Sequence, residues 1–192
     1  MAKVILIGGS PMCGKSTIAK TLALKLGWTC ISTDDIGEVL QTLVDINPMK
    51  SVNYMDYYAN TDKGILITDI IKYHTKIQPA ILRLIEIHST WGSPTIIEGW
   101  AIYPDIMDEI TSDSVKAVWL ISDESLLRNR LMSNIEFCKS AINTNIIQEN
   151  YLYRSLWHNN FLFEQCKQKN QKYILLNGKE EPEELATRIE EG

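Results

Sequence analysis

Eight residues near the start of the chain, GSPMCGKS from Gly9 to Ser16, bring together the residue types that bind phosphate groups. They fit the pattern G-x-x-x-x-G-K-[ST] of a phosphate-binding loop. The glycines let the backbone turn so that successive N–H groups point at phosphate oxygens, and a helix starting at Lys15 adds the positive end of its dipole. The Lys15 ammonium can reach the β- and γ-phosphates of a nucleotide, and the Ser16 hydroxyl can coordinate Mg²⁺.

The sequence on both sides of the loop supports this interpretation. A short apolar run at residues 3–7 is typical of a buried strand, and residues 15–26 carry apolar side chains at helical spacing and stop at Gly27. Cys13 occupies a variable position of the motif, and we expect its side chain to point outward without a catalytic role. We expect ATP and Mg²⁺ to be bound by Gly9, Ser10, Pro11, Met12, Cys13, Gly14, Lys15, Ser16 and Thr17.

Acidic residues follow two further predicted strands. Asp34 and Asp35 come after residues 29–33, and Glu98 follows residues 95–97. Ligands of an open parallel sheet bind at the carboxyl ends of its strands, where a carboxylate can accept a proton from a hydroxyl or hold Mg²⁺. We expect Asp34 to face the site as a catalytic residue and metal ligand, and Asp35 to cap the next helix. Glu98 is expected to serve catalysis and to join Ser16 as a metal ligand.

Three of the five arginines, Arg128, Arg130 and Arg154, follow the fourth predicted strand at residues 115–121. Fixed guanidinium groups offset the negative charge of a phosphoryl group during its transfer. We expect Arg130 and Arg154 to be catalytic and Arg128 to bind the nucleotide. Arg128 and Arg130 are two residues apart on a helix and cannot share a face, so only one of them should point at the nucleotide. The sequence leaves open which arginine this is.

The elements that must position these residues alternate between strands and helices. Strands are expected at residues 3–7, 29–33, 95–97, 115–121 and 173–176, and helices at 15–26, 36–44, 64–88, 123–135, 145–168 and from Pro182 onward. Ser122 is expected to cap the helix 123–135, and residues 47–62 look irregular. This alternation predicts an α/β fold with a parallel sheet and helices on both faces.

Composition narrows the functional class. The 192 residues carry a formal net charge of −5 and no basic run, which argues against a nucleic-acid partner. No apolar stretch approaches the length of a membrane span or of a signal peptide, so no membrane partner is expected. The four cysteines lack metal-ligand spacing. We therefore expect a single cytoplasmic domain with free thiols, either monomeric or dimeric.

With these residues in place, the chain resembles the P-loop small-molecule kinases of the adenylate kinase-like group, and among them the 2-phosphoglycerate kinase-like proteins. The resemblance rests on GGSPMCGKSTIAKTLALKLG, ISTDDIGEVL, PTIIEGWAIYP and VWLISDESLLRNRL, in this order. It implies a P-loop NTPase three-layer sandwich with a five-stranded parallel sheet in the order 2-3-1-4-5. It also implies one kinase domain with a core at 1–36, 92–133 and 170–192, a helical acceptor cap near 37–90 and a lid near 134–150, with Asp34 near the acceptor hydroxyl.

Two departures from that family pattern bear on the acceptor. Ser133 stands where such kinases often carry a further arginine, and the cap region 37–90 holds few basic residues. A phosphorylated acceptor would require an arginine clamp, so we expect a neutral or weakly charged hydroxyl compound instead.

The main hypothesis is therefore a Mg²⁺-dependent kinase that transfers the γ-phosphate of ATP to a small-molecule hydroxyl. A nucleotide-binding regulatory protein with little turnover and a nucleoside monophosphate kinase are the alternatives. A GTPase-type switch is disfavoured, because neither Glu98-Gly99 nor ISDES matches the guanine-nucleotide motifs.

Overall fold

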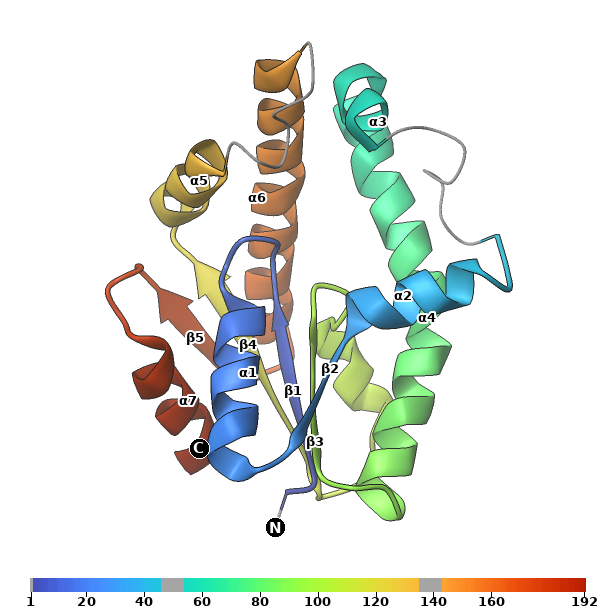
Figure 1. The fold of residues 1–192 in the computed structure, drawn as a ribbon, viewed down its shortest axis with the longest axis vertical. Helices are drawn as coiled ribbons and strands as arrows, with labels where there is room; N and C mark the ends of the chain where they lie inside the picture. Colours follow the sequence, from blue (N-terminus) through green and yellow to red (C-terminus); the bar gives the residue numbers. More distant parts are fainter. Residues whose placement is uncertain (1, 46–53, 135–142) are drawn as a thin grey trace.

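A computed structural model of the chain describes residues 2–45, 54–134 and 143–192 (Figure 1). Residues 46–53 and 135–142 lie outside the described residues, and they include part of the irregular stretch 47–62 and part of the expected lid. The elements, in chain order, are β1 (Val4–Gly9), α1 (Lys15–Leu26), β2 (Thr29–Ser32), α2 (Thr33–Gln41), α3 (Tyr54–Asn60), α4 (Lys63–Thr90), β3 (Thr95–Gly99), the 3₁₀ helix η1 (Pro104–Glu109), β4 (Val115–Ser122), α5 (Glu124–Ser133), α6 (Thr144–Gln168), β5 (Tyr173–Leu176) and α7 (Pro182–Glu191).

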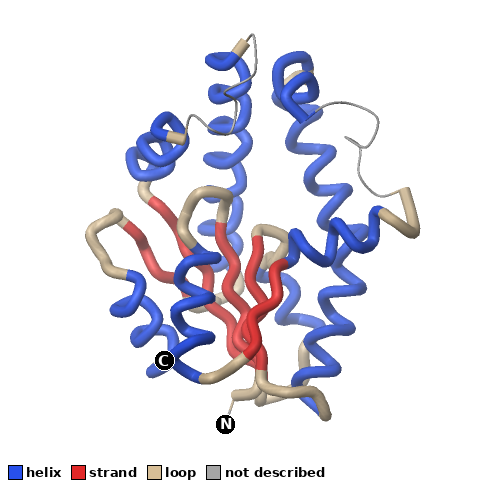
Figure 2. Tube along the Cα trace, viewed as in Figure 1, coloured by secondary structure: helices blue, strands red, loops and turns tan. Residues whose placement is uncertain are grey.

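The five strands form one parallel sheet in the order β2-β3-β1-β4-β5, which Figure 2 shows enclosed by helices. This confirms the predicted fold class and strand order. Parallel neighbours need a crossover between them, and the helices that follow each strand provide these crossovers. None of the described helices is both long enough and apolar enough to cross a membrane.

Side chains of β1 alternate between two apolar layers. Ile5 and Ile7 pack with residues of α1, α5 and α7, whereas Val4 and Leu6 pack with residues of α4, η1 and α6. All four side chains are buried. Because burying each aliphatic side chain contributes about 1.5–3 kcal/mol, β1 is held firmly at the centre of the sheet. The loop that follows it starts from a rigid support.

Several local expectations from the sequence are wrong. The carboxylate of Asp123, not Ser122, caps α5 by accepting a hydrogen bond from the Ser125 amide at 2.7 Å. Ser122 is instead the last paired residue of β4. The cap of α2 is Ser32, whose Oγ accepts from the amide of Asp34 at 3.2 Å, so Asp35 has no capping role.

Two further elements differ in extent from the sequence expectation. β3 continues through Glu98 to Gly99, because both residues stay in register with β1. Part of the stretch expected to be irregular forms α3, where Tyr57 and Tyr58 are buried and the rings of Tyr54 and Tyr58 meet edge to face at 4.8 Å. Aromatic packing one helical turn apart stabilises this short helix.

The end of β3 lies against the first turn of α2. A Cβ atom built on Gly99 would lie 1.7 Å from Oγ1 of Thr33, whose side chain is fully buried. Only glycine therefore allows the two segments to approach so closely.

We predict that Gly99→Ala lowers the free energy of unfolding by about 3 kcal/mol, because neither Gly99 nor Thr33 can move without displacing buried backbone. Gly27→Ala is the matched control: Gly27 has a φ of 67° and no atom near its Cβ position, so this variant should cost only about 1 kcal/mol. Urea unfolding of both variants measures the difference. Equal losses would show that the contact with Thr33 is not tight.

Candidate active site

The phosphate-binding loop joins β1 to α1 and has two left-handed residues, Met12 with φ 66° and Gly14 with φ 99°. Gly14 adopts this conformation without strain, which explains the second glycine of the motif. Arg130 on α5 donates from Nη1 to the carbonyl oxygens of Met12 at 3.1 Å and Cys13 at 2.7 Å. Arg130 therefore fixes the backbone of the loop directly.

The buried side-chain amide of Asn159 is hydrogen-bonded to the phosphate-binding loop. Ser10 is fully buried, and its hydroxyl donates to Oδ1 of Asn159 on α6 at 3.5 Å. The same Asn159 side chain accepts from the Ser122 amide at 2.9 Å and donates to its carbonyl at 3.0 Å. Asn159 thus ties the loop, β4 and α6 together, a role that no local sequence pattern indicated.

The side chain of Cys13 points inward, and the expectation that it faces outward is wrong. It is 1% exposed, and a Cβ atom on Gly9 would lie only 2.7 Å from its sulfur. Burial raises the pKa of the thiol, so it stays neutral and behaves as a small apolar side chain. Because the Cys13 sulfur occupies the space beside Gly9, only a small residue fits at position 9.

Two cavities adjoin this loop. The larger, of about 480 Å³, is lined by Lys15, Asp34, Trp100, Arg154 and several tyrosines. The smaller, of about 420 Å³, is lined by loop residues 12–17 together with Arg130 and the segment that leads from β5 to α7. Lys15 lines both cavities and is nearly buried, and no described acidic side chain forms an ion pair with it. Its ammonium group is therefore available to a ligand.

The two acidic candidates occupy different positions. Asp34 is exposed to the larger cavity, and its Oδ1 accepts a hydrogen bond from Nε1 of Trp100 at 2.8 Å. Glu98 is paired between Ile7 and Ser32 and is 4% exposed, and its Oε2 atom has no hydrogen-bond partner among the described residues. Since Glu98 lies on the same face of β3 as Ile96, its carboxylate lies on the side of the sheet that α1 covers.

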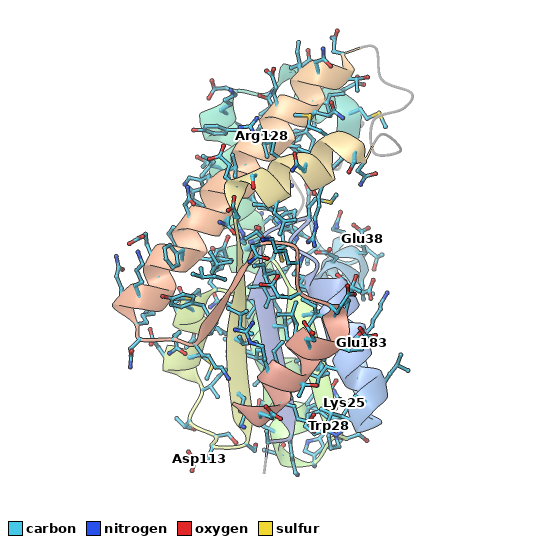
Figure 3. All side chains as sticks on the ribbon, turned by 90° about the vertical axis from the view of Figure 1, so that its left-hand side faces the viewer. Lys25, Trp28, Glu38, Asp113, Arg128 and Glu183 are labelled. Atoms are coloured by element: carbon cyan, nitrogen blue, oxygen red, sulfur yellow. The ribbon has the colours of Figure 1, made fainter. Side chains whose placement is uncertain are left out.

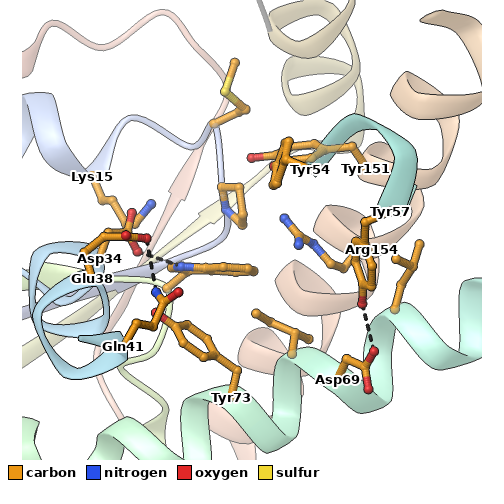
Figure 4. A pocket seen from close by; sticks show the side chains of 15 residues that line it. Lys15, Asp34, Glu38, Gln41, Tyr54, Tyr57, Asp69, Tyr73, Tyr151 and Arg154 are labelled. Carbon is orange, nitrogen blue, oxygen red and sulfur yellow. Dashed lines mark hydrogen bonds between the residues drawn. The ribbon is translucent and has the colours of Figure 1, made fainter. Parts of the chain in front are cut away.

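Arg154 on α6 reaches into the larger cavity opposite Lys15 and Asp34 (Figure 4). It is 4% exposed, and its guanidinium carbon lies 4.4 Å from the ring centre of Trp100, 4.8 Å from that of Tyr151 and 4.9 Å from that of Tyr58. Burial lowers the pKa of Arg154 to about 10, so the group remains charged at neutral pH. We call these three rings the aromatic cage.

Arg128 lies apart from the other candidates. Its guanidinium pairs with Glu124 at 2.9 Å on the exposed face of α5 (Figure 3), and it lines neither cavity. Of the two arginines on α5, the structure brings only Arg130 to the loop, as their spacing on the helix requires. Ser16 and Thr17 line the smaller cavity at the start of α1.

Two buried histidines pack near the ring of Trp100. The rings of His74 on α4 and His158 on α6 have centroids 4.5 Å and 5.9 Å from that of Trp100. Nδ1 of His74 lies 2.8 Å from the hydroxyl of Tyr103, which fixes its ring. Burial lowers the pKa of His158 to about 3 and that of His74 well below 6.5, so both rings are neutral at physiological pH.

Trp100, Asn159 and the two histidines were not among the sequence candidates for catalysis. Only Trp100 carried a signal, since it follows the Glu98-Gly99 pair at the end of a strand. The structure brings Lys15, Asp34 and Arg154 to one cavity.

We predict that the protein loses stability as the pH falls from 7 toward 4. Between the unfolded pKa of 6.5 and the folded value of about 3, the unfolded chain binds a proton at His158 that the folded chain does not. The free energy of unfolding should therefore decrease by up to about 1.4 kcal/mol per pH unit from this residue alone. Urea unfolding at several pH values measures the slope.

His158→Phe should reduce this slope, whereas His88→Gln, in the last turn of α4, should keep it. An unchanged slope in His158→Phe would contradict the assignment.

Comparison with known proteins shows which of them are similar to this chain in sequence. No family model matches the chain. A 2-phosphoglycerate kinase of Methanococcus maripaludis strain C7 is 29% identical over 145 residues, which are 66% of this chain and 46% of that protein. The 2-phosphoglycerate kinase of strain C5 is 30% identical over 118 residues, 55% of this chain and 38% of that protein. The chain thus spans less than half the length of these curated relatives.

Solved structures match the chain over nearly its whole length. Shikimate kinase from Bacteroides thetaiotaomicron has a TM-score of 0.57 at 17% identity and covers 98% of this chain and 96% of its own. A gluconokinase from Sinorhizobium meliloti 1021 has a TM-score of 0.54 at 15% identity, covering 97% and 88%. The chain therefore has the fold of the P-loop small-molecule kinases, and the resemblance that its motifs indicated is confirmed.

Proposed function

We propose that this protein is an ATP-dependent, Mg²⁺-dependent kinase that transfers the γ-phosphate to a hydroxyl group of a small-molecule acceptor. The observation that carries the proposal is the position of Lys15, which lines two cavities that both adjoin the phosphate-binding loop. A kinase of this kind needs one space for the nucleotide and one for the acceptor, with the transferred group between them.

The smaller cavity suits the nucleoside part of ATP. It opens beside Arg130, Gly178 and Pro182, at the positive end of α1. Arg130 holds two carbonyl oxygens of the loop and lines this cavity, so its charge lies close to bound phosphates. Lys15, which also lines this cavity, would then contact the β- and γ-phosphates.

Ser16 and Glu98 are the candidate protein ligands of a magnesium ion. The described residues hold no group of three or more His, Cys, Asp or Glu side chains that could bind a metal by themselves. Mg²⁺ does not require such a group, because it usually takes one or two protein oxygens together with phosphates and water. Glu98 supplies a buried carboxylate with an unpartnered Oε2 atom, and Ser16 supplies a hydroxyl. When bound, the ion would offset charge on the phosphate oxygens.

The larger cavity suits the acceptor. Asp34 faces it with one carboxylate oxygen held by Trp100, so the other can accept the proton of an acceptor hydroxyl. The hydroxyl oxygen would form the new bond to the γ-phosphorus while the bond to the β,γ-bridging oxygen breaks and ADP leaves. The cap predicted at residues 37–90 contributes Glu38, Tyr57 and Tyr73 to this cavity.

We predict that Asp34→Asn lowers turnover by at least about 100-fold while ATP still binds, because only the acceptor of the proton is removed. Asp35→Asn is the matched control, since Asp35 is exposed and lines neither cavity. ADP release across a panel of hydroxylated metabolites, together with ATP binding by calorimetry, separates the two effects. ATP binding without transfer to any acceptor in the unmodified protein would favour a regulatory nucleotide-binding protein instead.

Trp100→Phe should lower kcat about 10-fold and leave the KM for ATP unchanged. Phenylalanine keeps a ring against Arg154 but cannot donate the hydrogen bond that orients Asp34, an interaction with a charged group worth about 1.5–3 kcal/mol. Steady-state kinetics with saturating ATP measures the loss. An equal rise in both KM values with an unchanged kcat would assign Trp100 to binding alone.

A further inference from the structure

The side chain of Arg154 is a charged group in an apolar setting. Ring faces of Tyr58, Trp100 and Tyr151 surround it, and it is 4% exposed. Among the described residues, no carboxylate lies within ion-pair distance of its guanidinium, and its Nε atom has no hydrogen-bond partner. A buried cation without a counter-ion is costly, and arginine cannot reduce this cost by losing its proton at neutral pH.

The aromatic cage compensates for this cost only in part. Cation–π contacts attract the guanidinium but offer no hydrogen-bond acceptor to its N–H groups. The Tyr54 hydroxyl forms a hydrogen bond with Arg154 but is not an ion-pair partner. Arg154 lines the larger cavity, so a ligand bound there can reach its guanidinium. An anionic group on the ligand would provide both the missing counter-charge and acceptors beyond the Tyr54 hydroxyl.

The other charged side chains of the larger cavity indicate which kind of anion it would bind. Apart from Lys15 of the phosphate-binding loop, the remaining charged side chains in its wall are three carboxylates, those of Asp34, Glu38 and Asp69. Asp69 accepts a hydrogen bond from the hydroxyl of Tyr57 at 3.0 Å. A phosphate group would bring two negative charges close to these three carboxylates, and Arg154 would be the one arginine that offsets them. A carboxylate carries one charge, and its two oxygens match the planar fork of a guanidinium.

We infer that the acceptor is a small hydroxy acid without a phosphate group, whose carboxylate binds Arg154 while its hydroxyl faces Asp34. This inference rests on the proposed function and names the substrate class of that site. Trp100 connects the two ends, because its ring lies 4.4 Å from Arg154 and its N–H donates to Asp34. The indole thereby sets the spacing between the carboxylate and the reacting hydroxyl. Arg154 acts in acceptor recognition, rather than at the γ-phosphate as the sequence suggested.

The test compares compounds that share a carbon skeleton and differ in charge. Glycerate, 2-phosphoglycerate and glycerol form one set, and gluconate and glucose form another. Thermal unfolding with each compound measures binding, and ADP release with ATP measures transfer. We expect glycerate or gluconate to raise the melting temperature and the neutral and phosphorylated partners to have little effect.

Three variants link this binding to one side chain. Arg154→Met should weaken carboxylate binding about 100-fold, and it should not lower the melting temperature of the unliganded protein, because an apolar side chain suits the cage better than an unpaired cation. Arg154→Lys keeps the charge but not the planar fork, so it should bind more weakly than the unmodified protein. Arg83→Met, an exposed arginine paired with Glu86, is the control and should bind carboxylates normally.

The outcomes separate this inference from the proposed function. Binding of carboxylates that depends on Arg154, without transfer to any acceptor, would support the carboxylate subsite and contradict the kinase proposal. Transfer to neutral alcohols that is unaffected by Arg154→Met would support the kinase and overturn the inference. Preference for 2-phosphoglycerate over glycerate, or a panel without any Arg154-dependent carboxylate binding, would overturn it as well.

Discussion

The parallel pairing of β1 with β3, in register and buried on both faces, is the constraint on which the rest of the structure depends. It sets Ile7 beside Glu98, and β3 in turn sets Glu98 beside Ser32. Three segments far apart in the sequence therefore end at one edge of the sheet: the phosphate-binding loop, the start of α2 with Asp34, and the turn with Trp100. A shift of one residue in this register would turn every side chain of β3 to the opposite face and separate these groups.

A second constraint comes from the polar face of α6. Asn150, Arg154 and His158 follow one another at intervals of four residues and so project from one side of the helix. Each is buried: Asn150 donates to the carbonyl of Tyr58 at 2.8 Å, Arg154 lies in the aromatic cage, and His158 lies behind Trp100. Asn159, the next residue, holds the loop. One helix thus connects α3, the larger cavity and the phosphate-binding loop.

Local patterns in the sequence were sufficient to predict the fold. Short apolar strands, helical spacing and the G-x-x-x-x-G-K-[ST] loop can each be recognised from residues that are neighbours in the sequence. They also indicated Asp34, which lies in the wall of the larger cavity. They could not place Cys13, whose direction depends on the space beside Gly9, or assign α6, whose polar residues look like a solvated face in the sequence. The same holds for Trp100 and Asn159, since their contacts join residues 66 and 149 positions apart. Such contacts depend on the packing of complete elements.

The buried histidines and Arg154 differ in how the free-energy cost of burying them can be reduced. This difference distinguishes residues that support the fold from one that recognises a ligand. His74 and His158 avoid a buried charge by staying neutral, as the lowered pKa of each shows, so they can serve as permanent packing behind Trp100. Arg154 has no such option, because its pKa of about 10 keeps it charged at neutral pH. A neutral or apolar side chain at this position would give a more stable protein. The rings of the aromatic cage do not supply a counter-charge for this cation, and an anion in the adjoining cavity would do so.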